Sequence, residues 1–315
     1  MKLIVSRSLN PYFNLAAEAY FLQNTNDNVV IIWQSESAVV SGKHQNICAE
    51  INYKFCKENN ILPARRLSGG GTVFHDMGNI NFTFIKNIET EMDKAVNYKQ
   101  FLEPIRKALS SLGIETTYSH RDDLLLDGKK ISGNAQHIFQ QKKRVLHHGT
   151  LLYNCKLTNL SSALHSEGQY EDKAVKSVRS IVTNIKDHHN FGETQDFLVK
   201  FINQLSDSFG AAHFISENEL QQINQIKNEK FELEEWILGY SPKYIHKRLV
   251  SLNGKKYQLY MFVDKGEVIE MNLNDEQGEN CFVSECSACI SKPVSVATFK
   301  KGFIEISETE LYQFL

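Results

Sequence analysis

Three consecutive glycines, Gly69, Gly70 and Gly71, constrain the fold of this 315-residue chain more than any other feature of its sequence. Glycine loses more conformational freedom on ordering than any other residue, so a triplet indicates a backbone that approaches another group closely or takes up positive φ. Consecutive N–H groups in such a loop can form a concave anion site, and Arg65 and Arg66 precede it. Neither a P-loop nor a dinucleotide-binding spacing is present. Considered alone, the triplet fits a flexible turn beside two solvated arginines equally well.

A predicted hairpin favours the anion site. Asp127-Gly128 between two apolar runs is a strong hairpin signal, and it places Lys129 and Lys130 at the start of the return strand. A lysine on a rigid strand, followed by small residues such as Gly133, suits a fixed positive charge for a phosphate or carboxylate. For Lys130 alone, an exposed lysine on an edge strand is the competing interpretation.

The remaining pattern of residues 1–228 alternates between strand-like and helix-like segments. Short, continuous or alternating apolar runs predict strands, and apolar residues at helical spacing predict amphipathic helices. Strands are expected at 29–33, 38–41 and 78–85, and helices at 14–23, 94–112 and 195–209.

The pattern changes after about Asn228. Residues 256–263 and 267–273 alternate like two strands joined by a turn, and Ser307 with Glu310 predicts the start of a last helix. We therefore expect a main domain of residues 1–228 and a small α+β domain of residues 229–315.

Composition excludes several classes of protein. A hydrophobic content of 42% and a charged content of 23% are ordinary for a globular protein. The net charge of −2 gives no general affinity for nucleic acid. No apolar run is long enough to span a membrane, and the N-terminus resembles no leader peptide, so a cytoplasmic location is expected. Cys281, Cys286 and Cys289 lack a fourth ligand, which favours ordinary thiols over a metal site.

Several segments together resemble the lipoate–protein ligase A family, within the biotin/lipoate ligase superfamily. The resemblance covers most of the chain, and several motifs in the same order are more specific than any one. The matching segments are residues 10–18, 41–46, 65–76 (R-R-x-S-G-G-G-x-V-x-H-D), 130–133 (K-[IV]-S-G), 148–152 and 177–184.

The resemblance implies an α+β fold: a biotinyl/lipoyl protein ligase-type mixed sheet flanked by helices, with a small C-terminal α+β accessory domain. It implies an enzyme that activates lipoate with ATP and Mg²⁺ to lipoyl-AMP and transfers the lipoyl group to a lysine. The implied acceptors are lipoyl domains of 2-oxoacid dehydrogenase E2 subunits, the glycine cleavage H protein, or both. Neither nucleic acid nor a membrane is expected as a partner.

The resemblance also implies roles for particular residues. Lys130 would be catalytic and touch both the lipoyl carboxylate and the α-phosphate, while Asp123 would bind the metal. The family often has R-N-D-L where this chain has Asp122 before Asp123, and the extra carboxylate either strengthens a Mg²⁺ site or repels phosphate. Glu234 replaces the first tryptophan of the accessory-domain signature. The residues implied to bind the nucleotide are Arg66, Gly71, Thr72, Val73, Phe74, Asn79 and Lys130.

Alternative functions are distinguished by few residues. An octanoyl- or lipoyltransferase that works between carrier proteins holds its acyl group on a cysteine, and no cysteine lies between Cys56 and Cys155. A transferase that uses preformed lipoyl-AMP would keep the same residues and stays open. A biotin ligase and a binding module without activity fit the motifs less well. We expect His75 to brace the glycine loop, His148 to anchor its strand, and residues 141–144 to form an exposed turn.

Overall fold

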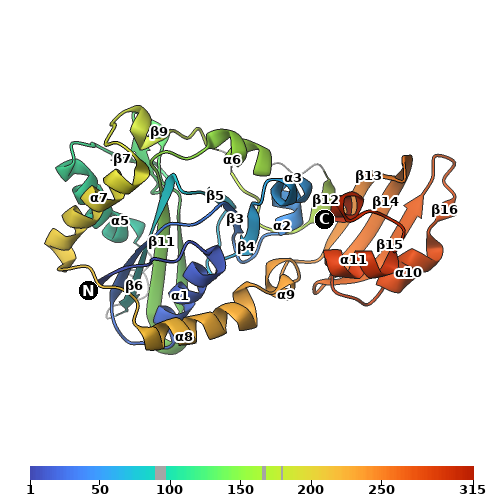
Figure 1. The fold of residues 1–315 in the computed structure, drawn as a ribbon, viewed down its shortest axis with the longest axis horizontal. Coiled ribbons are helices and arrows are strands. Elements are labelled where there is room, and N and C mark those ends of the chain that lie inside the picture. The colour runs from blue at the N-terminus through green and yellow to red at the C-terminus, as the bar shows by residue number, and fades with distance from the viewer. Residues whose placement is uncertain (89–96, 165–167, 179) are drawn as a thin grey trace.

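The computed structural model describes residues 1–88, 97–164, 168–178 and 180–315. Its main sheet has five strands in the order β1-β2-β6-β11-β10 (Figure 1). β1 and β2 are parallel, and the other neighbours are antiparallel. These strands are β1 (Lys2–Val5), β2 (Val29–Trp33), β6 (Asn79–Asn87), β11 (Arg144–Leu152) and β10 (Asn134–Phe139).

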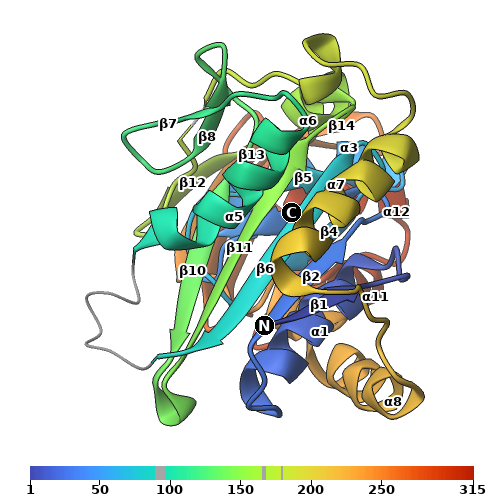
Figure 2. The ribbon, with the colours of Figure 1, turned by 90° about the vertical axis from the view of Figure 1, so that its left-hand side faces the viewer.

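Helices cover both faces of the main sheet. Helix α1 (Pro11–Gln23) packs on one face, whereas α5 (Tyr98–Ser111) and α7 (Thr194–Phe209) cover the other (Figure 2). The apolar run of β2 therefore has every residue buried, as a strand covered on both sides requires. Helix α1 begins earlier than predicted, because Asn10 caps its N-terminus and Pro11 occupies the first turn. Of the helix predicted at 94–112, residues 94–96 lie outside the described part.

Two small sheets carry the segments singled out in the sequence. The first has the order β4-β3-β5, and the glycine loop joins β4 to β5. The second is β7-β8-β9, in which Asp127 and Gly128 have φ of 48° and 76°, so the predicted hairpin is confirmed. Their strands are β3 (Ala38–Ser41), β4 (Leu62–Arg65), β5 (Val73–His75), β7 (Thr117–Tyr118), β8 (Leu124–Leu126) and β9 (Lys129–Lys130). Short helices α2 (Ile47–Glu50) and α3 (Tyr53–Glu58) lie between β3 and β4 in sequence, and α6 (Leu157–Ala163) follows β11.

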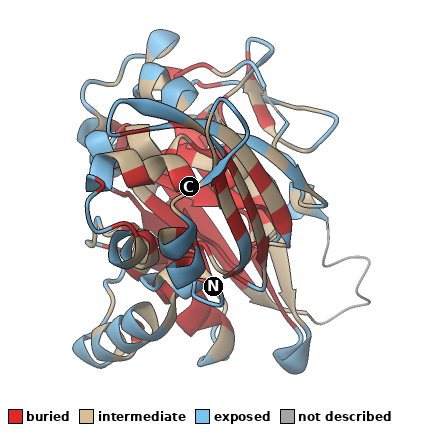
Figure 3. Ribbon diagram, turned by 90° about the vertical axis from the view of Figure 1, so that its right-hand side faces the viewer, coloured by how far each residue is buried: buried red, intermediate tan, exposed pale blue. Residues whose placement is uncertain are grey.

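A second five-stranded sheet, in the order β12-β13-β14-β15-β16, lies at one end of the molecule. Its strands alternate buried with more exposed residues (Figure 3), as expected for a sheet covered on one face. The strands are β12 (Gln169–Asp172), β13 (Tyr244–Leu252), β14 (Lys255–Asp264), β15 (Glu267–Asn274) and β16 (Asn280–Cys281). The helices are α10 (Val283–Cys289), α11 (Val296–Gly302) and α12 (Glu308–Leu311), and the capping box predicted at the start of α12 is confirmed.

The two parts of the chain share a sheet and a hydrophobic core, which the sequence did not predict. Strand β12 comes from within the predicted main domain but pairs with β13 of the second sheet. Apolar residues of both parts also belong to one continuous core. The division after residue 228 therefore stays a prediction. The connecting helices are α8 (Glu217–Ile226) and α9 (Glu234–Ile237), with a π-helical turn, η3 (Lys227–Phe231), between them. No helix in the described ranges is long and apolar enough to cross a membrane.

Arg144 corrects the prediction of an exposed turn at residues 141–144. Its side chain is fully buried, whereas the three residues before it are exposed. The guanidinium donates hydrogen bonds to the main-chain oxygens of Phe21, Thr25 and Asp27. Arg144 therefore fixes the C-terminal end of α1 and the loop after it, where carbonyl groups lack partners within the helix.

His147 makes the stability of the fold depend on pH. Its ring stacks on Phe101 of α5 with 5.0 Å between ring centroids. Burial lowers the pKa of His147 to about 3, so the folded chain leaves this ring neutral while the unfolded chain protonates it below about pH 6.5. The unfolded state thus binds more protons in this window, and stability falls as pH falls from about 6.5 towards 3. The same sign applies to His75 and His246, whose pKa values burial also lowers to about 3.

We expect His147→Phe to weaken this acid dependence. Phenylalanine keeps the stacking but cannot take up a proton in the unfolded state, so one contribution to the slope disappears. The free energy of unfolding would be measured in urea at several pH values. Below about pH 6.5 its slope against pH should be smaller in the variant than in the wild type, by up to about 1.4 kcal/mol per pH unit. The hydrogen bond between Gln136 Nε2 and His147 Nδ1 is lost at every pH and leaves the slope unchanged. Identical slopes for both proteins would contradict the burial of a neutral His147.

Candidate active site

A cavity of about 400 Å³ opens on the α1 face of the main sheet. Its floor comes from β2, β6 and β11 of this sheet, through Trp33, Asn81 and His148. Its walls come from the glycine loop, the β8–β9 hairpin, and residues 175–178 together with Ser180. The glycine triplet and Lys130, which lie far apart in sequence, therefore face the same space.

The glycine loop needs its glycines at two positions. Gly70 has a φ of 86°, which only glycine adopts without strain. A Cβ atom at Gly71 would lie 3.0 Å from Ser177 Oγ and 3.2 Å from its Cα. The loop is thus an ordered backbone that packs closely against a second segment, and the interpretation as a flexible turn is wrong.

Arg66 holds this loop from inside. Its Nη2 donates to the oxygens of Gly69 at 2.6 Å and Gly71 at 2.8 Å, and its Nη1 donates to Val40 O at 2.8 Å. Its Nε donates to Ser68 Oγ at 2.9 Å. The side chain is buried, and this burial lowers the pKa of Arg66 to about 10, so it stays charged at neutral pH. The guanidinium shapes the loop instead of extending into solvent.

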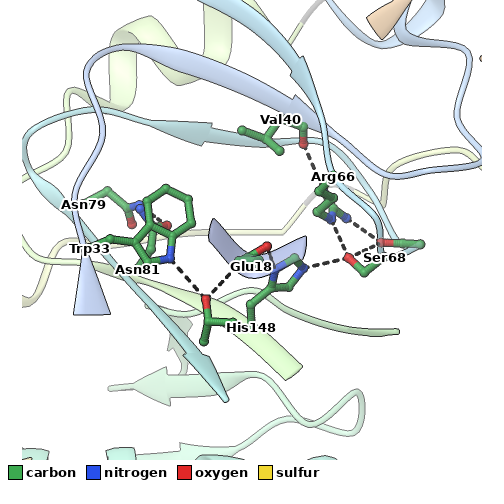
Figure 4. A network of polar contacts seen from close by, with 10 residues as sticks. Glu18, Trp33, Val40, Arg66, Ser68, Asn79, Asn81 and His148 are labelled. Atoms are coloured by element: carbon green, nitrogen blue, oxygen red, sulfur yellow. Dashed lines mark hydrogen bonds and ion pairs between the residues drawn. The ribbon is translucent and has the colours of Figure 1, made fainter. Parts of the chain in front are cut away.

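A chain of hydrogen bonds connects the loop to helix α1 (Figure 4). His148 lies between the Ser68 hydroxyl, 2.6 Å from Nε2, and the Glu18 carboxylate, 2.9 Å from Nδ1. Glu18 also accepts from Thr83 Oγ1 at 2.6 Å, and Thr83 accepts from Trp33 Nε1 at 3.1 Å. Because every link is buried, the floor of the cavity at Trp33 and the glycine loop are held in one fixed arrangement. His148 therefore braces the glycine loop as well as its own strand.

Lys130 is fixed by its backbone and by a carboxylate. Its N–H donates to Ile181 O at 3.0 Å, and its carbonyl accepts from Thr183 N at 3.1 Å. Its Nζ lies 3.1 Å from Asp123 Oδ1, and both side chains line the cavity. A Cβ atom at Gly133 would lie 3.5 Å from this Nζ, at ordinary van der Waals contact, so Gly133 packs beside the ammonium.

The cavity has an apolar region and a region with buried amides. Leu15, Val40 and Val73 supply aliphatic surface beside the indole of Trp33. Towards β6, Asn79 Nδ2 donates to Asn81 Oδ1 at 2.8 Å.

Three polar atoms near those amides are buried without a partner. Asn79 Oδ1, Asn81 Nδ2 and His75 Nδ1 make no hydrogen bond within the described part of the chain. Buried polar atoms of folded proteins are nearly always paired, so this cluster indicates a polar ligand or water. His75 also packs edge-on against Trp33, with 5.4 Å between ring centroids, and its lowered pKa keeps it neutral.

Six of the predicted site residues line the cavity and two do not. Phe74 points into the hydrophobic core, because alternate residues of a strand face opposite sides. Asn79 lies behind Asn81 and reaches the cavity only through it. Sequence analysis did not single out Glu18, although a carboxylate on an otherwise apolar helix face was an available signal. The six residues that line it are Arg66, Gly71, Thr72, Val73, Asp123 and Lys130.

Comparisons with known proteins agree on one family. Residues 10–209 match the family described as lipoyl protein ligase A/B catalytic domain. Lipoate-protein ligase LplJ of Bacillus subtilis is 36% identical over 288 residues, which cover 87% of this chain and 84% of the relative. Lipoate–protein ligase 1 of Staphylococcus aureus is 32% identical over 276 residues, covering 85% and 82%.

Solved structures agree on the fold. Plasmodium falciparum LipL1 in complex with lipoate has a TM-score of 0.64 and 22% identity, covering 99% of this chain and 97% of its own. A lipoate-protein ligase A bound with ATP has a TM-score of 0.64 and 21% identity, covering 76% and 98%. The predicted α+β fold, with a mixed sheet flanked by helices and a further C-terminal domain, is confirmed.

Proposed function

This chain belongs to the lipoate–protein ligase family, and from that premise we propose how its residues divide the work of an ATP-dependent ligase. In the first half-reaction, a carboxylate oxygen of lipoate attacks the α-phosphate of ATP, which forms lipoyl-AMP and releases pyrophosphate. In the second, the ε-amine of an acceptor lysine attacks the acyl carbon, which forms an amide and releases AMP. The acceptors are lipoyl domains of E2 subunits or the glycine cleavage H protein.

The observation that carries this assignment is the common cavity of Lys130 and the glycine loop. The first half-reaction brings two anions together and builds negative charge on the phosphoryl group. A fixed ammonium and backbone N–H groups, oriented before the substrates arrive, stabilise such charge without reorganisation. Hydrogen bonds fix both the N–H and the carbonyl group of Lys130, so its ammonium suits this role.

The glycine loop would wrap the adenylate with its backbone. Gly71, Thr72 and Val73 line the cavity, and Thr72 Oγ1 donates to Gln45 Oε1 at 2.9 Å. Arg66 would act on the nucleotide through the loop, because its N–H groups are donated to loop oxygens and to Val40. Phe74 would support the loop from the core.

The two regions of the cavity would separate the two substrates. The aliphatic surface of Leu15 and Val40 beside Trp33 suits the lipoyl tail, which has no hydrogen-bonding groups beyond its carboxylate. Asn81, which Asn79 orients through a hydrogen bond from behind, suits the adenine edge, which carries both a donor and acceptors.

The donor set also suits Mg²⁺. Asp123 is the one carboxylate that lines the cavity in the described part of the chain. Magnesium in nucleotide sites commonly takes one or two carboxylates together with substrate phosphates and water. Asp123 would hold the ion, which when bound would offset the charge of the phosphate chain.

Lipoate-dependent exchange of pyrophosphate into ATP tests the first half-reaction, and mass spectrometry of an added E2 lipoyl domain tests the second. We expect exchange that requires lipoate, and a lipoyl-sized mass increase on the acceptor lysine. Transfer from synthetic lipoyl-AMP without any exchange would instead identify a transferase that uses the preformed adenylate. Exchange supported by biotin in preference to lipoate would contradict the assignment.

A further inference from the structure

A strap of chain, residues 173–178 and 180–183, crosses the mouth of the cavity and is fixed to both of its sides. On the glycine-loop side, Thr72 N donates to Ser177 Oγ at 2.9 Å, and Gln45 Nε2 donates to the same oxygen at 3.1 Å. On the lysine side, the backbone of Lys130 exchanges hydrogen bonds with Ile181 and Thr183. The strap is therefore a defined surface that joins the two halves of the site.

The strap exposes three apolar side chains to solvent. Val175 is 49% exposed, Val178 is 61% exposed and Ile181 is 78% exposed. Its polar Ser177 instead turns inward to the glycine loop. All three follow one another within a few residues on a backbone that is fixed beside the site, and exposed apolar residues next to a site are a feature of interaction surfaces.

We propose that this strap is the docking surface for the acceptor protein, which would place an apolar patch against it beside the lysine to be modified. This inference rests on the proposed function. A lysine side chain has a flexible stem of only about four carbons, so the surface that carries it must lie against the cavity mouth. Val175 and Val178 line the cavity while also reaching solvent, so a protein whose lysine enters the cavity must contact them.

Charge indicates the chemistry of this partner. Lys173 on the strap, and Arg121 and Lys129 on the opposite rim, are all exposed. Lys176 pairs with Asp172 at 2.8 Å and keeps about half of its side chain exposed. An apolar centre with a cationic rim fits an acceptor with acidic residues around its apolar contact, because complementary charge speeds encounter and sets orientation.

The small size of the patch favours a transient partner over a second copy of this chain. Three side chains are few beside the 20–30 residues a side, roughly 1,600 Å² in total, that a stable interface requires. A contact that must release its product after each transfer has no need of such an area.

Ile181→Asp tests the proposal, because Ile181 lies outside the cavity lining. With an E2 lipoyl domain as the varied substrate, we expect kcat/KM for transfer to fall by about tenfold, mainly through KM. Lipoate-dependent pyrophosphate exchange should stay within about twofold of the wild type. Ile181→Leu should restore transfer. Ile304→Asp is the matched control, because Ile304 is 84% exposed, does not line the cavity and lies outside the strap in sequence.

Lys173→Glu tests the charge independently. We expect a lower kcat/KM for the same acceptor at low salt, and a smaller loss at high salt, because the rim charges are exposed and screened. An equal loss at both salt concentrations would contradict the electrostatic part of the proposal.

Three results would overturn the docking proposal. Wild-type transfer by Ile181→Asp would show that the patch does not touch the acceptor, and an equal loss of exchange would show that it serves the first half-reaction. Sedimentation that reveals a wild-type dimer broken by Ile181→Asp would assign the patch to a second copy. Absence of exchange from the wild type would instead refute the ligase assignment, and docking would then be measured by transfer from synthetic lipoyl-AMP.

Discussion

Replacing Lys130 by alanine is expected to lower lipoate-dependent pyrophosphate exchange by about 10²–10³-fold while the chain remains folded. The lost ammonium would face both the attacking carboxylate and the α-phosphate, where charge develops. Arg66 cannot replace it, because its guanidinium already donates to the glycine loop and to Val40. Exchange kinetics and circular dichroism of the variant would measure activity and folding separately.

Two further variants sharpen this test. Lys129→Ala is the matched control, because Lys129 is the exposed neighbour on the same hairpin and should leave exchange unchanged. Lys130→Ala also leaves Asp123 without its ion pair at 3.1 Å. The double variant Lys130→Ala with Asp123→Asn removes that carboxylate charge and should remain inactive. Exchange at the wild-type rate from Lys130→Ala would refute the role of this ammonium.

Replacing Arg65 by alanine is expected to lower the free energy of unfolding by about 3–5 kcal/mol. Arg65 is fully buried, and burial lowers its pKa only to about 10, so it is charged at neutral pH. Its Nε and Nη2 donate to the oxygens of Trp236 and Ile237, and its Nη1 donates to Gln45 O at 2.8 Å. Alanine would leave these buried oxygens without donors and a void between the loop of residues 42–45 and α9.

Urea unfolding of matched arginine variants measures this effect. Arg106 pairs with Glu103 through two hydrogen bonds of 2.9 Å on the surface of α5. Because surface ion pairs contribute about 0–1 kcal/mol, Arg106→Ala should cost little. An Arg65→Ala effect no larger than the Arg106→Ala effect would contradict the structural role of Arg65.

Elements of the fold were predicted correctly where the residues that form them are adjacent in the sequence. The bounds of β2 and β3, the Asp127-Gly128 turn and the capping box of α12 are as predicted, because each depends on a few adjacent residues. Arg65 and Arg144 were missed for the opposite reason. The carbonyl groups that bind them lie 171 and 123 residues away, at Trp236 and Phe21. Nothing near either arginine indicated that it would be buried.

Features of the candidate site were likewise predicted in part and missed in part. The common cavity of Lys130 and the glycine loop was predicted from several motifs in order, and the residue patterns alone left it open. Phe74 and Asn79 were carried over from the family resemblance. Strand alternation turns Phe74 into the core while Val73 reaches the cavity. Asn79 shares a face of β6 with Asn81 but reaches the cavity only through its hydrogen bond to Asn81. Glu18 acts through His148, a contact across 130 residues that no local pattern contains.

A crystal structure with a non-hydrolysable lipoyl-adenylate analogue, in which a sulfamoyl group replaces the phosphate, tests the central claim most directly. We predict the sulfamoyl group within hydrogen-bonding distance of Lys130 Nζ and of N–H groups of the glycine loop, with the acyl chain beside Trp33. An analogue bound away from this cavity, or bound within it without contact to Lys130 or the loop, would contradict the claim.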